Sequence, residues 1–123
     1  MTTSTTKPRI AFISHGGGPL PILGDPSHQE MIDELKKLAD LLDKPSAILL
    51  ISAHWEELLP TLTSGVTPSL IYDYSGFPEE SYSITYPCPG EPQLANAVKN
   101  VLEDNGIQVK LDEQRGFDHG LFI

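Results

Sequence analysis

Two histidines in this sequence each follow a short apolar run, an arrangement that suggests one shared site. His15 comes shortly after the run Ile10–Ile13, and His54 comes shortly after Ile48–Ile51. Runs of this kind are typical of buried strands. Two imidazoles that converge on one point are candidate metal ligands. The alternative, that each histidine only makes a local hydrogen bond, is left open by the sequence.

Two further histidines carry other chemical possibilities. His119 lies between Asp118 and Gly120. A flanking or nearby carboxylate can orient an imidazole, which suits a general acid–base, although a turn histidine has the same surroundings. His28 lies where a helix is expected to begin. It is either a surface residue there or is brought near the site by the glycine-rich loop that precedes it.

Other chemically capable groups give weaker signals. Glu56 and Glu57 follow His54 closely and can offer a carboxylate, but surface acids are far commoner than ligands. Cys88 lies among prolines, without the surroundings that activate a thiol. The glycine run 16–18 has neither the Gly-Lys-Ser/Thr of a phosphate loop nor the spacing of a dinucleotide fingerprint. One region is rich in aromatic residues: Tyr72, Tyr74, Phe77, Tyr82 and Tyr86. Most of them are expected to pack in the fold, although an aromatic wall also suits a flat phenolic ligand.

The elements that would position His15 and His54 form a strand–helix–strand unit. Strands are expected at residues 9–14 and 47–53, with a helix over 28–43 between them. Ser27 and Glu30 form a possible capping box for that helix. Such a unit has a right-handed crossover and parallel strands. Both histidines would then lie at the carboxyl edge of the sheet, where open α/β sheets bind their ligands.

The rest of the chain continues the same pattern. Short β-prone segments occupy 61–64 and 69–74, and a helix begins at Glu91-Pro92 and ends at Asn105-Gly106. A strand of alternating polarity covers 107–111, and the apolar run 121–123 reads as the start of another strand. The predicted fold class is therefore α/β, with a mostly parallel sheet flanked by helices.

Length and charge restrict the function classes. The 123 residues make one domain, expected over 8–123, after a polar and frayed tail at 1–7. A net charge of −9 argues against nucleic acid and anionic membrane surfaces. No apolar stretch reaches membrane-spanning length, and the tail has no signal-peptide core. The single cysteine fits a reducing compartment, so the cytoplasm is the expected location.

Five motifs together resemble those of one family. The chain is similar to the class III extradiol ring-cleaving dioxygenases with the LigB-like fold, in the branch of 4,5-DOPA dioxygenases. The motifs occur in the family's order and cover nearly the whole chain. They are Phe12–Pro19, Ser52–Glu56, Tyr72–Glu79, Tyr86–Gly90 and Arg115–Gly120.

The resemblance implies a non-haem Fe(II) enzyme that opens catechol rings with dioxygen, with Zn(II) in the same site in some members. His15 and His54 match the first two metal ligands of the family. His119 matches the histidine beside the metal that takes a catechol proton and later returns one. His28 matches a loop histidine of many relatives, with a substrate-binding or loop role.

The length departs from the family pattern. Members are roughly twice as long, and their third metal ligand lies in the second half. The resemblance therefore implies an N-terminal part of a truncated LigB-like fold, and three protein ligands are usual in catalytic sites. The expected partners are a small catechol, dioxygen, and either a second copy of the chain or the missing C-terminal half. Two alternatives remain: a catalytically incompetent metal-binding or oligomerising domain, and a zinc hydrolase that uses the same histidines.

Overall fold

The structure is a computed structural model that describes residues 9–123. The chain divides into two compact units, the first ending at Lys44 and the second covering Pro45–Ile123. The predicted tail at 1–7 lies outside the described residues. The expectation of one domain over 8–123 stays a prediction.

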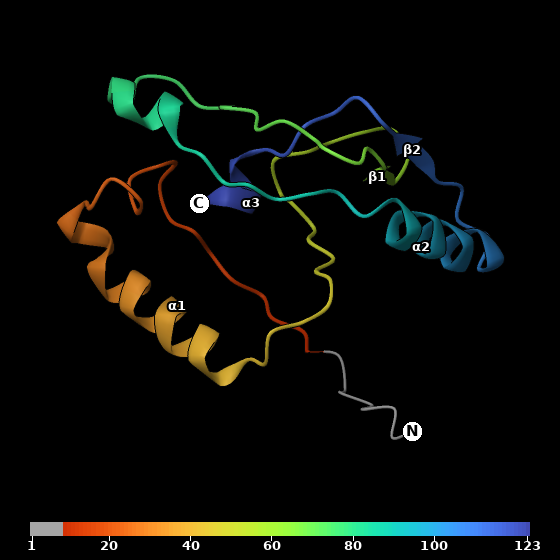
Figure 1. Cartoon of the computed structure of the whole chain (residues 1–123), viewed down its shortest axis with the longest axis horizontal. Helices are drawn as coiled ribbons and strands as arrows, with labels where there is room; N and C mark the ends of the chain where they lie inside the picture. The colour runs from red at the N-terminus through yellow and green to blue at the C-terminus, as the bar shows by residue number, and fades with distance from the viewer. Residues whose placement is uncertain (1–8) are drawn as a thin grey trace. The chain divides into compact units, whose positions relative to one another are not determined.

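The first unit is built around helix α1, Gln29–Leu41, which follows a 3₁₀ turn, η1, at Pro26–His28 (Figure 1). The helix predicted over 28–43 is therefore confirmed, with each end moved by one or two residues. Its apolar face, including Met31, is half-buried. The predicted capping box is wrong, because the Ser27 hydroxyl donates to the Asp25 carboxylate and the helix start has no side-chain cap.

The two strands predicted at 9–14 and 47–53 are wrong. Within residues 9–123 the only sheet has two strands, and neither run belongs to it. A strand requires a neighbour that satisfies its backbone groups, and an apolar sequence alone does not supply one. Both runs instead lie outside any helix or strand and are exposed, with Phe12 at 103% and Ile51 at 92% exposure.

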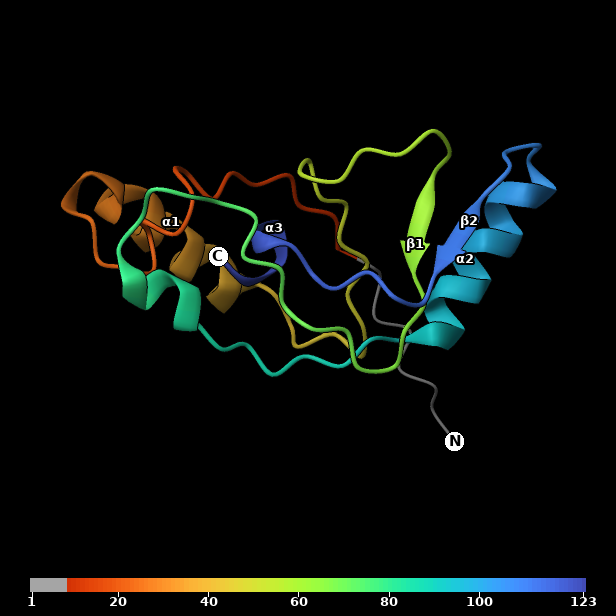
Figure 2. The same cartoon turned by 90° about the horizontal axis from the view of Figure 1, so that it is seen from above.

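The second unit contains the parallel sheet. Strand β1, Thr61–Thr63, pairs in parallel with β2, Lys110–Asp112, and Leu62 lies opposite Leu111. Helix α2, Pro92–Asp104, leads into β2 and packs beside both strands (Figure 2). The β-prone segment at 61–64 and the helix from Glu91-Pro92 are confirmed. The strand predicted at 107–111 begins three residues later, at Lys110.

Two short helices complete the second unit, η2 at Glu79–Ser83 and α3 at His119–Phe122. The run 121–123 was expected to begin a strand, and this is wrong. The Asp118 carboxylate accepts a hydrogen bond from the Gly120 backbone N–H at 2.9 Å, which starts a helical turn at His119. A mixed α/β fold with a parallel sheet is confirmed. Among the described residues, none of the helices has the length and apolar character needed to cross a bilayer.

Candidate functional site

His119 is held by a carboxylate from a distant part of the second unit. The Asp73 carboxylate accepts from the His119 backbone N–H at 2.9 Å and contacts the His119 ring Nδ1 at 2.7 Å. Only 6% of His119 is exposed. Backbone and ring of one residue therefore meet the same oxygen, which fixes the direction of the imidazole.

This contact also decides which ring nitrogen carries the proton. Partial burial alone would raise the pKa of Asp73, but hydrogen bonds from the His119 backbone and ring outweigh it and lower that pKa. An ionised carboxylate only accepts hydrogen bonds, so Nδ1 of His119 is the donor. In the neutral ring the lone pair is then on Nε2, the nitrogen that can take up a proton or face a metal.

The lowered pKa of Asp73 predicts a pH-dependent contribution to stability. Ionised Asp73 stabilises the fold fully above the ordinary aspartate pKa of about 3.9, and this contribution is lost as the pH falls through the lower folded value. Asp73→Asn should therefore lower the unfolding free energy at about pH 6, and the gap to wild type should be smaller at a pH below the ordinary aspartate pKa of about 3.9. Urea denaturation of both chains at both pH values measures this gap in unfolding free energy. Asp40→Asn, on the exposed side of α1, is the control. A gap that stays constant with pH would contradict the assignment.

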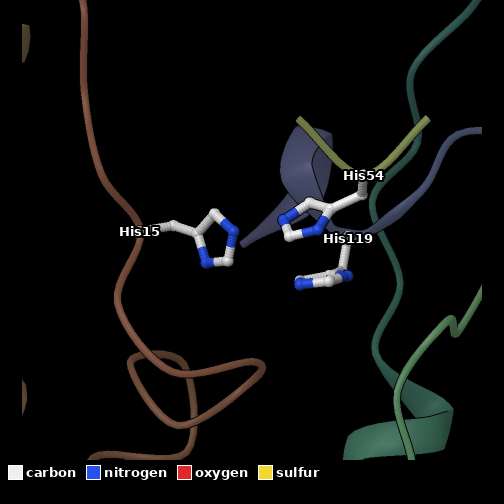
Figure 3. A group of neighbouring side chains, drawn as sticks. All are labelled: His15, His54 and His119. Carbon is white, nitrogen blue, oxygen red and sulfur yellow. The ribbon is translucent and has the colours of Figure 1, made fainter. Parts of the chain in front are cut away.

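His54 lies directly against His119. Their ring centroids are 3.9 Å apart, and one ring nitrogen of each lies within 4.8 Å of the other (Figure 3). His54 is exposed, so a ligand can reach it, whereas His119 is buried beneath it. The sequence set these two residues 65 positions apart. The fold joins a predicted metal ligand and a predicted acid–base in one place.

An aromatic cluster adjoins His119, and its members come from the aromatic-rich region of the sequence. Tyr74 meets the His119 ring edge-on, with centroids 5.6 Å apart. It also packs against Phe77 and Tyr82, at 5.6 and 5.3 Å. Its hydroxyl donates to the Ser81 carbonyl at 2.5 Å, and burial raises its pKa. Tyr74 is therefore an uncharged aromatic side chain, suited to packing against another aromatic ring.

His15 and His28 belong to the first unit. His15 is half-buried and precedes a turn in which Gly16 has a φ of +76°. The His28 ring accepts from the Gly17 backbone N–H through Nε2 at 3.0 Å, and its Nδ1 contacts Asp25 at 2.6 Å. Both ring nitrogens are thus engaged within the loop, which favours a loop role for His28. The predicted convergence of His15 with His54 stays a prediction.

The contact between His28 and the glycine turn makes a prediction about Gly16. A methyl group there would lie 2.4 Å from Cδ2 of His28, and φ is already in the glycine-favoured region. Gly24 is the matched control, because its φ is +79° with nothing within 4 Å among the described residues. Gly24→Ala should cost roughly 1–2 kcal/mol of backbone strain. Gly16→Ala should cost about 1–3 kcal/mol more for overpacking, measured by urea denaturation, and equal losses would contradict the packing.

The donor set of the second unit fits a metal ion in part. Imidazole nitrogens are good ligands for both iron and zinc. His54 supplies one such group, with the His119 ring beside it, and catalytic sites usually use three protein ligands. Glu57, considered as a carboxylate ligand, accepts instead from the Trp55 indole N–H at 3.0 Å. The fit is that of an incomplete site to which further ligands must be added.

Sequence reasoning missed Asp73. The carboxylate expected to orient His119 was a flanking or nearby one, with Asp118 the adjacent candidate, but the residue that does so lies 46 positions earlier. The one available signal was its place in the motif 72–79, as an acid between two tyrosines that follow the apolar residues Leu70 and Ile71. A charged residue in such a position must find a partner on folding.

Comparison with known proteins gives consistent matches. The family described as the catalytic LigB subunit of aromatic ring-opening dioxygenase matches residues 9–123. Dioxygenase tasH of Hapsidospora irregularis is 44% identical, over 93% of this chain and 38% of its own length. The 4,5-DOPA dioxygenase extradiol of Beta vulgaris is 38% identical over 91% and 42%, and that of Escherichia coli is 37% identical over 95% and 41%. The chain thus spans about two-fifths of the length of these curated relatives.

Proposed function

We propose, because this chain belongs to the family of catalytic LigB subunits of aromatic ring-opening dioxygenases, that it carries metal-binding and proton-transfer residues of an extradiol dioxygenase. The substrate class is a catechol of the DOPA type, as the names of two similar relatives suggest. The observation that carries the proposal is the Asp73–His119 pair stacked against His54.

The metal of the proposed site is Fe(II), with Zn(II) as an alternative occupant. His54 of the second unit and His15 of the first are the proposed ligands, and a further ligand comes from the remainder of the catalytic subunit. Bound Fe(II) would supply the redox chemistry that joins dioxygen to the catechol. Imidazole ligands suit this ion, and its open positions suit a bidentate catechol.

The chain's own residues supply the proton chemistry. Nε2 of His119 accepts a proton from a catechol hydroxyl, while Asp73 holds Nδ1 and stabilises the charge that forms on the ring. The same nitrogen later returns the proton to the product. Tyr74 and its aromatic neighbours offer a wall for the substrate ring. His28 is proposed to hold the loop rather than to bind substrate.

Association with other polypeptide is a second part of the proposal. The exposed apolar runs at 10–13 and 48–51 would be covered by the remainder of a catalytic subunit. A second copy of the chain is the alternative cover. The competing function, a non-catalytic domain that oligomerises, would use the same exposed runs.

The proposed location is the cytoplasm, and residues 8–123 are proposed to act as one domain once associated.

A chimera tests the proposal without requiring this chain to act alone. The chain replaces the matching residues of the Escherichia coli relative, with which it shares 37% identity, and the product is loaded with Fe(II) under anaerobic conditions. Oxygen uptake that depends on DOPA or another catechol is the expected result. No uptake with any catechol from a folded, iron-loaded chimera would refute the dioxygenase proposal. Ester or amide hydrolysis with Zn(II) and without dioxygen would indicate a hydrolase instead.

A further inference from the structure

Asp118 is buried beside the two stacked histidines, and the proton chemistry assigned above does not use it. Only 5% of the residue is exposed. Its Oδ1 accepts from the Ser52 hydroxyl at 2.7 Å and from the Gly120 backbone N–H at 2.9 Å. Its Oδ2 pairs with the Arg115 guanidinium at 3.2 Å. One carboxylate thus joins three separate points of the second unit.

The first of these contacts leads to His54. The Ser52 hydroxyl donates to Asp118, and its oxygen accepts from the His54 backbone N–H at 3.1 Å. The hydroxyl is thereby used as donor and acceptor at once, which gives it one orientation. Asp118 therefore reaches the backbone of His54 through one intermediate side chain.

The contact with Arg115 reaches the other side of His54. The Arg115 guanidinium lies 4.4 Å from the centroid of the Trp55 ring, in a cation–π arrangement. Trp55 follows His54 directly, and Ser52 precedes it by two residues. The turn that carries His54 is therefore connected to Asp118 on both sides.

The contact with Gly120 leads to His119. Asp118 caps the first turn of α3, and His119 is the first residue of that helix. The packing here is close, because a methyl group on Gly120 would lie 2.7 Å from Ser52 Oγ and 3.1 Å from Cδ2 of His54. Glycine at this position lets the histidine turn lie directly on the helix.

We infer that Asp118 is a positioning residue shared by His54 and His119, which sets the spacing of their rings through Ser52 on one side and the first turn of α3 on the other. The roles of the two aspartates differ. Asp73 fixes the rotation and the proton of one ring, whereas Asp118 fixes the distance between two rings. The significance of this spacing for metal binding rests on the proposed function.

The inference predicts how Asp118→Asn fails. An asparagine has one acceptor oxygen and one amide that only donates. With the oxygen toward Ser52 and Gly120, its amide faces the Arg115 guanidinium, and in the flipped state the amide faces the Gly120 N–H. Either orientation breaks one of the three connections. Ser52→Ala is the milder variant, because it removes only the link to His54 and leaves the other two contacts of Asp118.

The primary experiment needs neither metal nor substrate. In the labelled full chain, the nuclear Overhauser effect between ring protons of His54 and His119 reports their 3.9 Å stacking. Asp118→Asn and Ser52→Ala should each weaken it at least about twofold, and the double variant should be no worse than Asp118→Asn alone. Glu91→Gln is the control, because its carboxylate also accepts a backbone N–H at the start of a helix, from Gln93 at 3.1 Å, but in α2. That control should leave the effect unchanged.

Zn(II) binding to the same chains gives the second readout. Loss of a residue that orients a ligand typically costs about 10–100-fold in metal affinity, so both variants should show this loss and Glu91→Gln should not. Unchanged ring contacts in folded Asp118→Asn and Ser52→Ala chains would overturn the inference. If Asp118→Asn does not fold, Ser52→Ala decides alone. An inactive wild-type chimera would count against the dioxygenase proposal and would leave the ring-contact result intact.

Discussion

His119→Asn is expected to slow catechol-dependent oxygen uptake by the chimera by about 10²–10⁴-fold, the usual contribution of a positioned general acid–base. Asparagine suits this test because its amide nitrogen occupies the place of the ring Nδ1. It can still donate to Asp73, whose oxygen lies 2.7 Å from Nδ1 in the native protein. What it lacks is an atom at Nε2, the nitrogen proposed to take the catechol proton.

The comparison with Asp73→Asn separates proton transfer from orientation. That variant leaves Nε2 in place and replaces the ionised acceptor by a neutral amide, which can also rotate and donate to the ring. A loss of about 10–100-fold is expected, smaller than that of His119→Asn, together with an altered pH profile. His119→Asn with more than a tenth of the wild-type rate would remove His119 from proton transfer. Circular dichroism of both variants controls for folding.

Hydrophobic periodicity predicted the helices well, because helices are satisfied by local hydrogen bonds. Helix α1 has apolar residues such as Met31 and Leu35 one turn apart, and α2 begins at a proline and ends before Gly106, whose φ is +80°. These signals lie within the helices themselves. Glu91 even caps the start of α2, by accepting from the Gln93 N–H at 3.1 Å.

Strands were predicted less well because they depend on partners. The runs at 10–13 and 48–51 have the most apolar sequences of the chain, and yet the sheet is formed by Thr61–Thr63 and Lys110–Asp112. A strand exists only where a second segment lies at hydrogen-bonding distance. Which segment that is depends on the whole fold, and the sequence of the apolar run alone does not determine it.

The candidate site shows the same division between local and distant information. Histidines at the ends of apolar runs, and a histidine in the motif around Asp118, were visible in the sequence. The carboxylate of Asp73, which decides the tautomer of His119, was not, because 46 residues separate them. In the sequence, Asp118 was the flanking candidate for the carboxylate that orients His119. Its hydrogen bonds instead connect it to Ser52, Gly120 and Arg115.

His54→Ala is expected to have the second large effect, the loss of bound metal. A direct ligand should matter more than an outer partner, so Zn(II) affinity should fall by more than about 100-fold. His28→Gln is the matched control, because it also removes one imidazole. The glutamine oxygen can still accept from the Gly17 N–H, which the ring meets at 3.0 Å, so the loop turn is retained. Affinity within about threefold of wild type is expected for this control.

His15→Ala then tests whether the two units contribute to one metal ion. If they do, this variant and His54→Ala should each lose nearly all bound Zn(II), and the double variant should bind no less than either. This non-additivity is required when two residues hold the same ion. Separate sites would give a different result, in which each single variant keeps about half of the metal and only the double variant loses all of it. Since the strand–helix–strand unit expected to bring the two histidines together does not form as strands, metal stoichiometry is the direct test of their convergence.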